Sequence, residues 1–152
     1  MRRKKASPGS NCRPASLPHR AAIATTVLVL LTSVFSSVAQ AQDSQALLRL
    51  ETARQLRNGG SALRASKEYE AIVPLFRAGS DLVLYGRVLL EASQIALSVG
   101  DYLHAIERAT EAAGIYAGQG DRRNEAMAIN FVGLAKLYRG EYAAALLSFQ
   151  RA

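Results

Sequence analysis

The sequence has few of the side chains on which most catalytic and metal sites depend. Its 152 residues include one cysteine, Cys12, two histidines, His19 and His104, and no tryptophan. Structural zinc sites take four ligands, mostly Cys and His, and a Cys–His nucleophile needs one of each close together. Carboxylates are the only abundant catalytic group that remains. We therefore predict that this segment is not an enzyme and that it has no catalytic residue, no metal site and no cofactor site.

Acidic residues are missing from the first 42 positions. Six Lys and Arg residues lie within 1–20, and an uncharged stretch with an apolar centre follows over 21–38. A basic segment, an apolar segment and then Ala39-Gln40-Ala41, with small residues at the positions that a signal peptidase recognises, are typical of a secretory signal peptide. We predict a signal peptide over 1–41, cleavage after Ala41 and a periplasmic or secreted mature protein. The alternative is a membrane anchor over 21–38, since a span needs about 20 apolar residues.

The excess of positive charge belongs largely to this leader. The whole chain has 19 Lys and Arg against 12 acids, which gives a net charge of +7. Without the six basic residues of the leader, 13 remain against 12 acids and the net charge is +1. A nucleic-acid-binding domain keeps a basic face in its folded form. We predict no nucleic-acid partner, and membrane contact only through the leader if it stays uncleaved.

Glycines recur every 40 residues in the rest of the chain. Gly60, Gly100 and Gly140 are each followed, five positions later, by an alanine. Self-similarity at a fixed period of this length is typical of stacked structural repeats. We expect residues 42–152 to form three units, at about 43–80, 81–120 and 121–152, with the last one truncated.

Each unit has the pattern of two helices separated by the glycine. Over 81–99, apolar residues recur at spacings of three and four, and polar residues form the opposite stripe. Asp81 and Asp121 are expected to cap the first helices of their units, and Gly100 is expected to end a helix in the left-handed conformation. One hairpin cannot cover both of its apolar faces. The sequence therefore predicts an all-α solenoid of antiparallel helix hairpins.

Residues that disturb helices give further expectations. Pro74 lies in the second helix of the first unit and is expected to kink that helix or end it near Val73. Gly114 and Gly118 have the spacing of a close helix contact, or of a loosened helix end. The stretch Gly118-Gln119-Gly120 is interpreted as the turn between two hairpins.

Charges of both signs alternate on the second helix of the second unit. His104, Glu107, Arg108 and Glu111 share one stripe there. Such alternation is typical of a helix face in contact with water. We expect these side chains to be solvated and His104 to have no catalytic role.

The third unit resembles the tetratricopeptide repeat (TPR) family, in a variant longer than the usual repeat of about 34 residues. Ile129, Val132 and Gly133 stand where the first helix of that family has small or apolar residues, and Gly140-Glu141-Tyr142-x-x-Ala145 matches the start of its second helix. The resemblance is good for the second unit and weaker for the first, which has Ala62 in place of the tyrosine. It implies a right-handed superhelical solenoid.

The resemblance also implies a function. TPR-like solenoids commonly bind peptide segments on a concave groove made by their first helices, and this implies a scaffold or interaction module of the bacterial envelope with a protein or peptide partner. Arg54, Arg87, Gln94 and Asn130 would hold the backbone or the acidic side chains of that partner. The implied groove positions are Leu47, Leu50, Arg54 and Arg57 in the first unit, Arg87, Leu90, Gln94 and Leu97 in the second, and Met127, Asn130, Leu134 and Leu137 in the third.

A second function is kept as an alternative. The sequence stops within the last expected helix, so we expect it to be a fragment of a longer protein. The segment Gly120-Asp121-Arg122-Arg123-x-Glu125-Ala126 is similar to repeats that precede CHAT-type caspase-like proteases. On this interpretation the repeats would be the N-terminal recognition arm of a larger enzyme or sensor.

Overall fold

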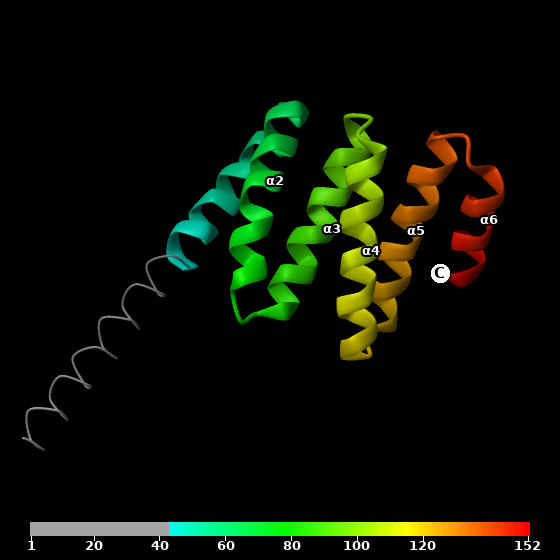
Figure 1. Cartoon of the computed structure of the whole chain (residues 1–152). Coiled ribbons are helices and arrows are strands. Elements are labelled where there is room, and N and C mark those ends of the chain that lie inside the picture. The colour runs from blue at the N-terminus through cyan, green and yellow to red at the C-terminus, as the bar shows by residue number, and fades with distance from the viewer. Residues whose placement is uncertain (1–42) are drawn as a thin grey trace, which may run out of the picture. The chain divides into compact units, whose positions relative to one another are not determined.

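The computed structural model describes residues 43–152, which consist of helices joined by short turns (Figure 1). The all-α prediction is thereby confirmed for this part of the chain. The predicted signal peptide, its cleavage site and the alternative membrane anchor lie outside the described residues. A first helix covers residues 43–58, and it is followed by α2 (Ala62–Ala78), α3 (Leu82–Ser98), α4 (Tyr102–Gln119), α5 (Arg122–Tyr138) and α6 (Tyr142–Arg151).

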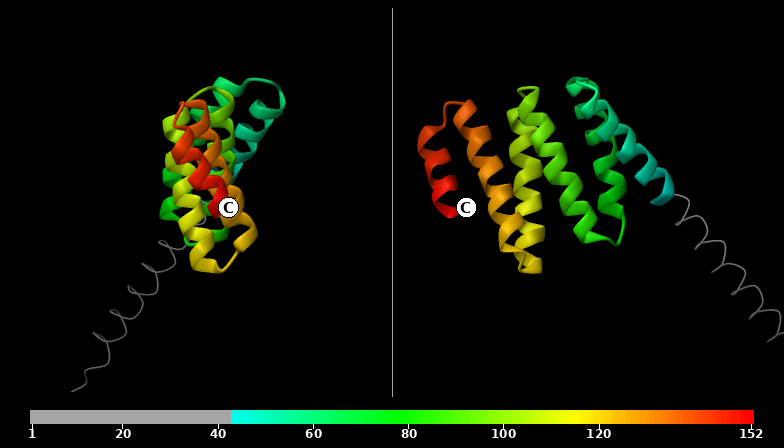
Figure 2. Two further views of the ribbon diagram at one scale, coloured as in Figure 1. Left: turned by 90° about the vertical axis from the view of Figure 1, so that its right-hand side faces the viewer. Right: turned by 180° about the vertical axis from the view of Figure 1, so that it is seen from behind.

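The helices stand side by side in a row in the order of the sequence (Figures 1 and 2). From α2 to α6, each helix packs against the next one along the chain, and α3 also contacts α5. Ion pairs join helices that are two apart: Arg54 of the first helix pairs with Glu91 of α3, and Arg108 of α4 pairs with Glu70 of α2. The helices therefore alternate between two layers, as in an array of helical hairpins. No helix within 43–152 combines the length and the apolar character that a membrane crossing requires.

The aspartates cap the helices as predicted. The carboxylate of Asp81 accepts a hydrogen bond of 2.9 Å from the backbone N–H of Leu84, and that of Asp121 accepts one of 3.1 Å from Asn124. These bonds satisfy N–H groups that have no partner inside the helix. The sequence therefore located the starts of α3 and α5 correctly.

Gly100 ends its helix in the left-handed conformation, as predicted, and the other repeated glycines do the same. Gly60, Gly100 and Gly140 have φ of +76°, +81° and +81°, and Gly120 has φ of +72°. After α3, the N–H of Gly100 bonds to Leu97 O at 3.2 Å and the next N–H bonds to Ala96 O at 2.9 Å. This pair of bonds is a Schellman motif, which needs a residue with positive φ. Of the predicted turn over 118–120, only Gly120 lies in the turn, because α4 continues through Gln119.

Pro74 does not end its helix, so that of the two expected effects, a kink or an end near Val73, the end is wrong. Helix α2 continues to Ala78 with Pro74 inside it. Proline removes one hydrogen bond from the helix interior. Pro74 is exposed, whereas Ile72, Val73 and Phe76 are buried on the opposite face. Because burial of a large apolar side chain contributes about 1.5–3 kcal/mol, Phe76 holds the helix in place beyond the proline.

Small residues and aromatic rings fill the contacts between helices. Ala65, Ala105 and Ala145, the alanines of the repeat, are all fully or almost fully buried. A Cβ added to Gly133 of α5 would lie 2.5 Å from the ring of Phe149 on α6, so glycine is required for this contact. The absence of a side chain lets the aromatic ring rest directly on the backbone of the neighbouring helix.

The expected contact of Gly114 and Gly118 with another helix is absent from the described part of the chain. Gly114 and Gly118 both lie inside α4 and are exposed. A Cβ at either position would meet no atom within 4 Å. Of the two expected alternatives, a close helix contact or a loosened helix end, the close contact is wrong, because no helix of the described part passes over these residues.

Candidate functional site

A hollow of about 360 Å³ lies between α3 and α5, with α4 behind it. Four of the residues predicted for the groove line it together, namely Arg87, Leu90, Gln94 and Met127. A volume of this size is within the range of ligand pockets, which begins at about 300 Å³. The other residues that line the hollow are Val83, Glu91, Tyr116, Asn124 and Phe131.

Tyr116 reaches this hollow from α4 because Gly86 of α3 has no side chain. A Cβ at Gly86 would lie 3.0 Å from Cζ of Tyr116 and 3.3 Å from its hydroxyl oxygen. Burial raises the pKa of Tyr116, and the positive charge of Arg87 opposes this rise. The hydroxyl makes no hydrogen bond to another side chain or backbone group within 43–152, and the described part contains no buried side-chain polar atom without a partner. The tyrosine hydroxyl is therefore one more polar group at the hollow, although Tyr116 as a whole is only 3% exposed.

Arg87 is the cation of the hollow. Its side chain is exposed, and no carboxylate in the described part of the chain pairs with it. The neighbouring Asn124 is held in place, since its amide nitrogen donates a 2.6 Å hydrogen bond to Asp121. Arg87, Gln94 and the Tyr116 hydroxyl thus offer donors beside the apolar side chains of Met127 and Leu90.

Arg54 and Arg57, the predicted groove cations of the first unit, are engaged within the protein. Arg54 donates two hydrogen bonds to the carboxylate of Glu91, from Nε at 2.9 Å and from Nη2 at 2.7 Å. Arg57 approaches the same carboxylate at 3.7 Å, and the hydroxyl of Tyr69 donates to it at 2.8 Å. Glu91 therefore joins the first helix, α2 and α3, and its two arginines are not free in the way that Arg87 is.

The remaining predicted groove residues do not line the hollow. Asn130 and Leu137 are exposed elsewhere on α5, and Leu134 is half-buried. Leu97 packs against a small cluster of buried alanines, Leu50 is almost fully buried in the main core, and Leu47 lines a separate hollow beside α2. The structure therefore brings together four residues of the predicted groove, and the other predicted residues lie outside the hollow.

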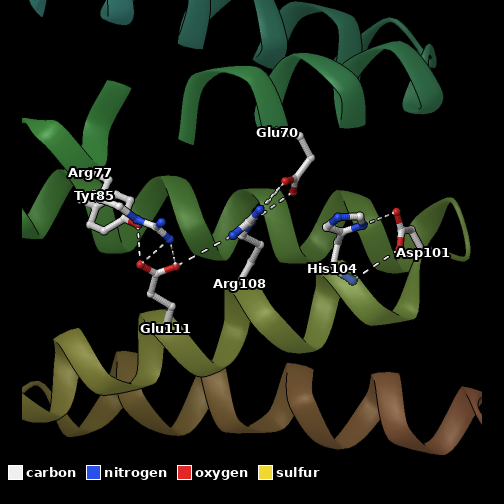
Figure 3. Close-up of polar contacts among 7 residues, drawn as sticks. All are labelled: Glu70, Arg77, Tyr85, Asp101, His104, Arg108 and Glu111. Atoms are coloured by element: carbon white, nitrogen blue, oxygen red, sulfur yellow. Dashed lines mark hydrogen bonds and ion pairs between the residues drawn. The ribbon is translucent and has the colours of Figure 1, made fainter. Parts of the chain in front are cut away.

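The polar stripe of α4 is not uniformly solvated, and this prediction needs correction (Figure 3). The side chain of Arg108 is only 17% exposed and binds Glu70 of α2 at 2.6 Å. Glu111 accepts two hydrogen bonds from Arg77, at 2.8 and 2.7 Å, and one of 2.6 Å from the hydroxyl of Tyr85. The residue spacing matched a solvated helix face, but the partners come from helices that are distant in the sequence.

These contacts repeat one arrangement at two places along the row. In each, a glutamate accepts hydrogen bonds from an arginine two helices earlier and from a tyrosine on the helix between them. Burial raises the pKa of Glu91, but the hydrogen bonds from Arg54 and Tyr69 outweigh it, so that the pKa is lowered overall. A carboxylate held in this way stays ionised at neutral pH and cannot act as a general acid. We interpret both arrangements as structural connections between helices.

His104 is exposed, as predicted, and its contact is local. Its Nδ1 lies 2.7 Å from a carboxylate oxygen of Asp101. The hydrogen bond to Asp101 raises the pKa of His104. Within residues 43–152, no group of three or more His, Cys, Asp or Glu side chains is placed to hold a metal ion.

The sequence patterns did not point to Tyr116, Asn124 or Phe131 as parts of the site. Only the glycine in the middle of α3, Gly86, could have indicated that the ring of Tyr116 passes there. No protein-family model, curated protein sequence or solved structure matches this chain.

Proposed function

We propose that the chain is an interaction module that binds a peptide segment of another protein in the hollow between α3 and α5. On this proposal the array is a TPR-like, right-handed superhelical solenoid, and the hollow lies on its concave face. The described part would act by binding and not by catalysis, as a scaffold or assembly factor of the bacterial envelope.

The observation that carries the proposal is the hollow itself. It combines apolar side chains such as Met127 with the donors of Arg87, Gln94 and Tyr116. Apolar walls with a few fixed polar groups are typical of sites that bind ligands selectively. Because Arg87 has no carboxylate partner within residues 43–152, the hollow favours a segment with an acidic side chain or a free carbonyl group close to an apolar one.

The location of the protein is part of the same proposal. The basic and apolar segments before Ala41 support export to the periplasm or secretion, with removal of the leader. The array would then meet envelope or secreted proteins as partners.

The proposal is tested with peptides selected for binding to residues 42–152. We expect Arg87→Glu to weaken the selected peptides at least about tenfold, which corresponds to 1.4 kcal/mol. Affinity is measured by fluorescence anisotropy. Arg64→Glu is the matched control, since Arg64 is an exposed cation of α2 that does not line the hollow. Equal affinities of both variants and the parent chain would contradict the proposal. Arg54 is unsuitable for this test, because its reversal would also break the ion pair with Glu91.

A further inference from the structure

A second hollow, which we call the α4–α6 furrow, lies between α4 and α6 with α5 as its floor. It has a volume of about 530 Å³ and shares no lining residue with the hollow between α3 and α5. The furrow is open to solvent at Leu147, whose side chain is 67% exposed. The lining residues that matter here are Gly114 and Ala117 of α4, Val132 and Lys136 of α5, and Leu147 and Arg151 of α6.

The corresponding gap between α2 and α4 is closed by charged side chains (Figure 3). Glu70 of α2 binds Arg108 of α4 at 2.6 Å, and Arg77 of α2 binds Glu111 of α4 at 2.7 Å. Such charge-assisted contacts hold the two helices together and fill the space between them. The gap one repeat earlier is therefore part of the structure and not a binding site.

One repeat later, the same positions cannot form these bridges. Forty residues on from Glu70 and Arg77 are Thr110 and Ala117, and forty on from Arg108 and Glu111 are Ser148 and Arg151. No ion pair joins α4 to α6 within the described residues. The furrow stays open because short, uncharged side chains on α4 have replaced the two long charged ones.

Glycines show which kind of group the furrow lacks. Two other glycines inside helices receive an aromatic ring, since Gly86 receives Tyr116 and Gly133 receives Phe149, whereas Gly118 of α4 is open. Gly114 lies in the wall of the furrow, and no atom comes within 4 Å of the place where its Cβ would be. The furrow therefore has an unfilled place of the type that an aromatic ring fills at two other points of this chain.

The charge of the furrow is of one sign. Lys136 and Arg151 line it, and no acidic residue does. Lys136 bonds to the hydroxyl of Ser148 at 3.3 Å, and neither cation has a carboxylate partner within 43–152. The nearest acid along the lining is Glu125, which shares a smaller adjoining hollow with Arg151 but pairs with Arg122 at 3.5 Å. The furrow thus presents positive charge beside an apolar surface.

We propose that the α4–α6 furrow docks a segment of a partner protein that carries an aromatic side chain flanked by acidic residues. The ring rests on Gly114 against Val132 and Leu147, and the carboxylates pair with Lys136 and Arg151. Small residues on α4 allow the close approach that the ring requires. This surface is separate from the hollow between α3 and α5, so the two sites bind independently.

The test uses a labelled peptide of about 15 residues in which one Phe lies between Glu residues, with fluorescence anisotropy as the readout. We expect binding to residues 42–152, and at least tenfold weaker binding when the Phe is Ala or when the Glu residues are Lys. Gly114→Leu fills the furrow and should also weaken binding at least tenfold. Gly118→Leu is the matched control, since Gly118 is equally open on the same helix but does not line the furrow. Circular dichroism checks that both variants keep the helical fold.

Several outcomes would overturn the proposal. The first is absence of binding at a peptide concentration of about 1 mM. The second is an equal affinity of Gly114→Leu and Gly118→Leu for the peptide. The third is loss of binding in Arg87→Glu, because this would place the peptide in the hollow between α3 and α5. A concentration-dependent dimer, detected by light scattering and abolished by Gly114→Leu, would make a second copy the occupant and would also overturn it. Failure of the Arg87→Glu test with selected peptides leaves the furrow proposal intact, because the furrow does not include Arg87.

Discussion

At the scale of single residues, the carboxylates of this array are mainly connectors between helices. Glu91 pairs with Arg54 and Arg57 and accepts a hydrogen bond from Tyr69, and its side chain is only 16% exposed. A partly buried carboxylate with several donors stabilises the fold, whereas removal of its charge leaves the donors without a partner. The sequence did not predict this role for either glutamate, because the partners are distant along the chain. The partners of Glu91 lie 22 to 37 residues away, and those of Glu111 lie 26 to 34 residues away.

We predict that Glu91→Gln lowers the free energy of unfolding at pH 7 by about 1–3 kcal/mol. Since the pKa of Glu91 is lowered overall in the folded protein, its stabilising effect is present above the unfolded-state pKa of about 4.3 and is lost as the pH falls through the folded-state value. The difference between variant and parent should therefore shrink in acid. Urea denaturation at several pH values measures it.

The exposed Glu107 provides the control for this prediction. No ion pair or side-chain hydrogen bond of the described part involves Glu107, and Glu107→Gln should change the stability by less than about 0.5 kcal/mol. A pH-independent effect of Glu91→Gln, or equal effects of the two changes, would contradict the account of Glu91 as an ionised connector.

At the scale of helices, the contacts depend on which glycines are covered by a ring. Gly133 lies under Phe149, whereas Gly114 is open. We predict that Gly133→Ala destabilises the protein by about 1–3 kcal/mol, because the new methyl group and the ring compete for the same space. Gly114→Ala should instead stabilise it by about 0.5–1 kcal/mol through helix propensity. Thermal unfolding followed by circular dichroism distinguishes the two directions.

A second variant separates the clash from a general effect on α5. In a Phe149→Ala background the methyl group meets no ring, so Gly133→Ala should no longer be destabilising. If the cost of Gly133→Ala were the same in both backgrounds, the contact with Phe149 would not be its cause.

The sequence predicted the helices better than the contacts between them. Capping aspartates and left-handed glycines act within a few residues, so Asp81 and Gly100 were placed correctly from local patterns alone. The helix end that was one of two expected effects of Pro74 is absent, because tertiary burial of Phe76 outweighs a local preference for ending the helix. In the site, the family resemblance implied Arg87, Leu90 and Gln94, which line one hollow, but Tyr116 enters through a gap that only the packing of α3 on α4 creates.

At the scale of the whole molecule, residues 43–152 form an array in which contacts run mainly between neighbouring helices. Arrays of this kind have extended surfaces that lie across several helices. Two such surfaces are present, the hollow between α3 and α5 and the α4–α6 furrow. The proposed function therefore belongs to the array, since each surface needs residues from three helices.

Export is a prediction about the whole chain. The leader predicted over 1–41 should be removed after Ala41, so that the mature protein begins at Gln42. Intact-mass measurement of the protein recovered from the cells that produce it gives the position of the cleavage. A protein that keeps Met1 and sediments with the membrane would instead support the anchor over 21–38.

The proposal that the array binds peptides in the hollow between α3 and α5 is tested most directly by hydrogen–deuterium exchange, with and without a peptide selected for binding to residues 42–152. The account predicts slower exchange in α3 and α5 around Arg87 and Met127, with the exposed face of α2 unchanged. Slower exchange confined to other helices, with α3 and α5 unaffected, would contradict it.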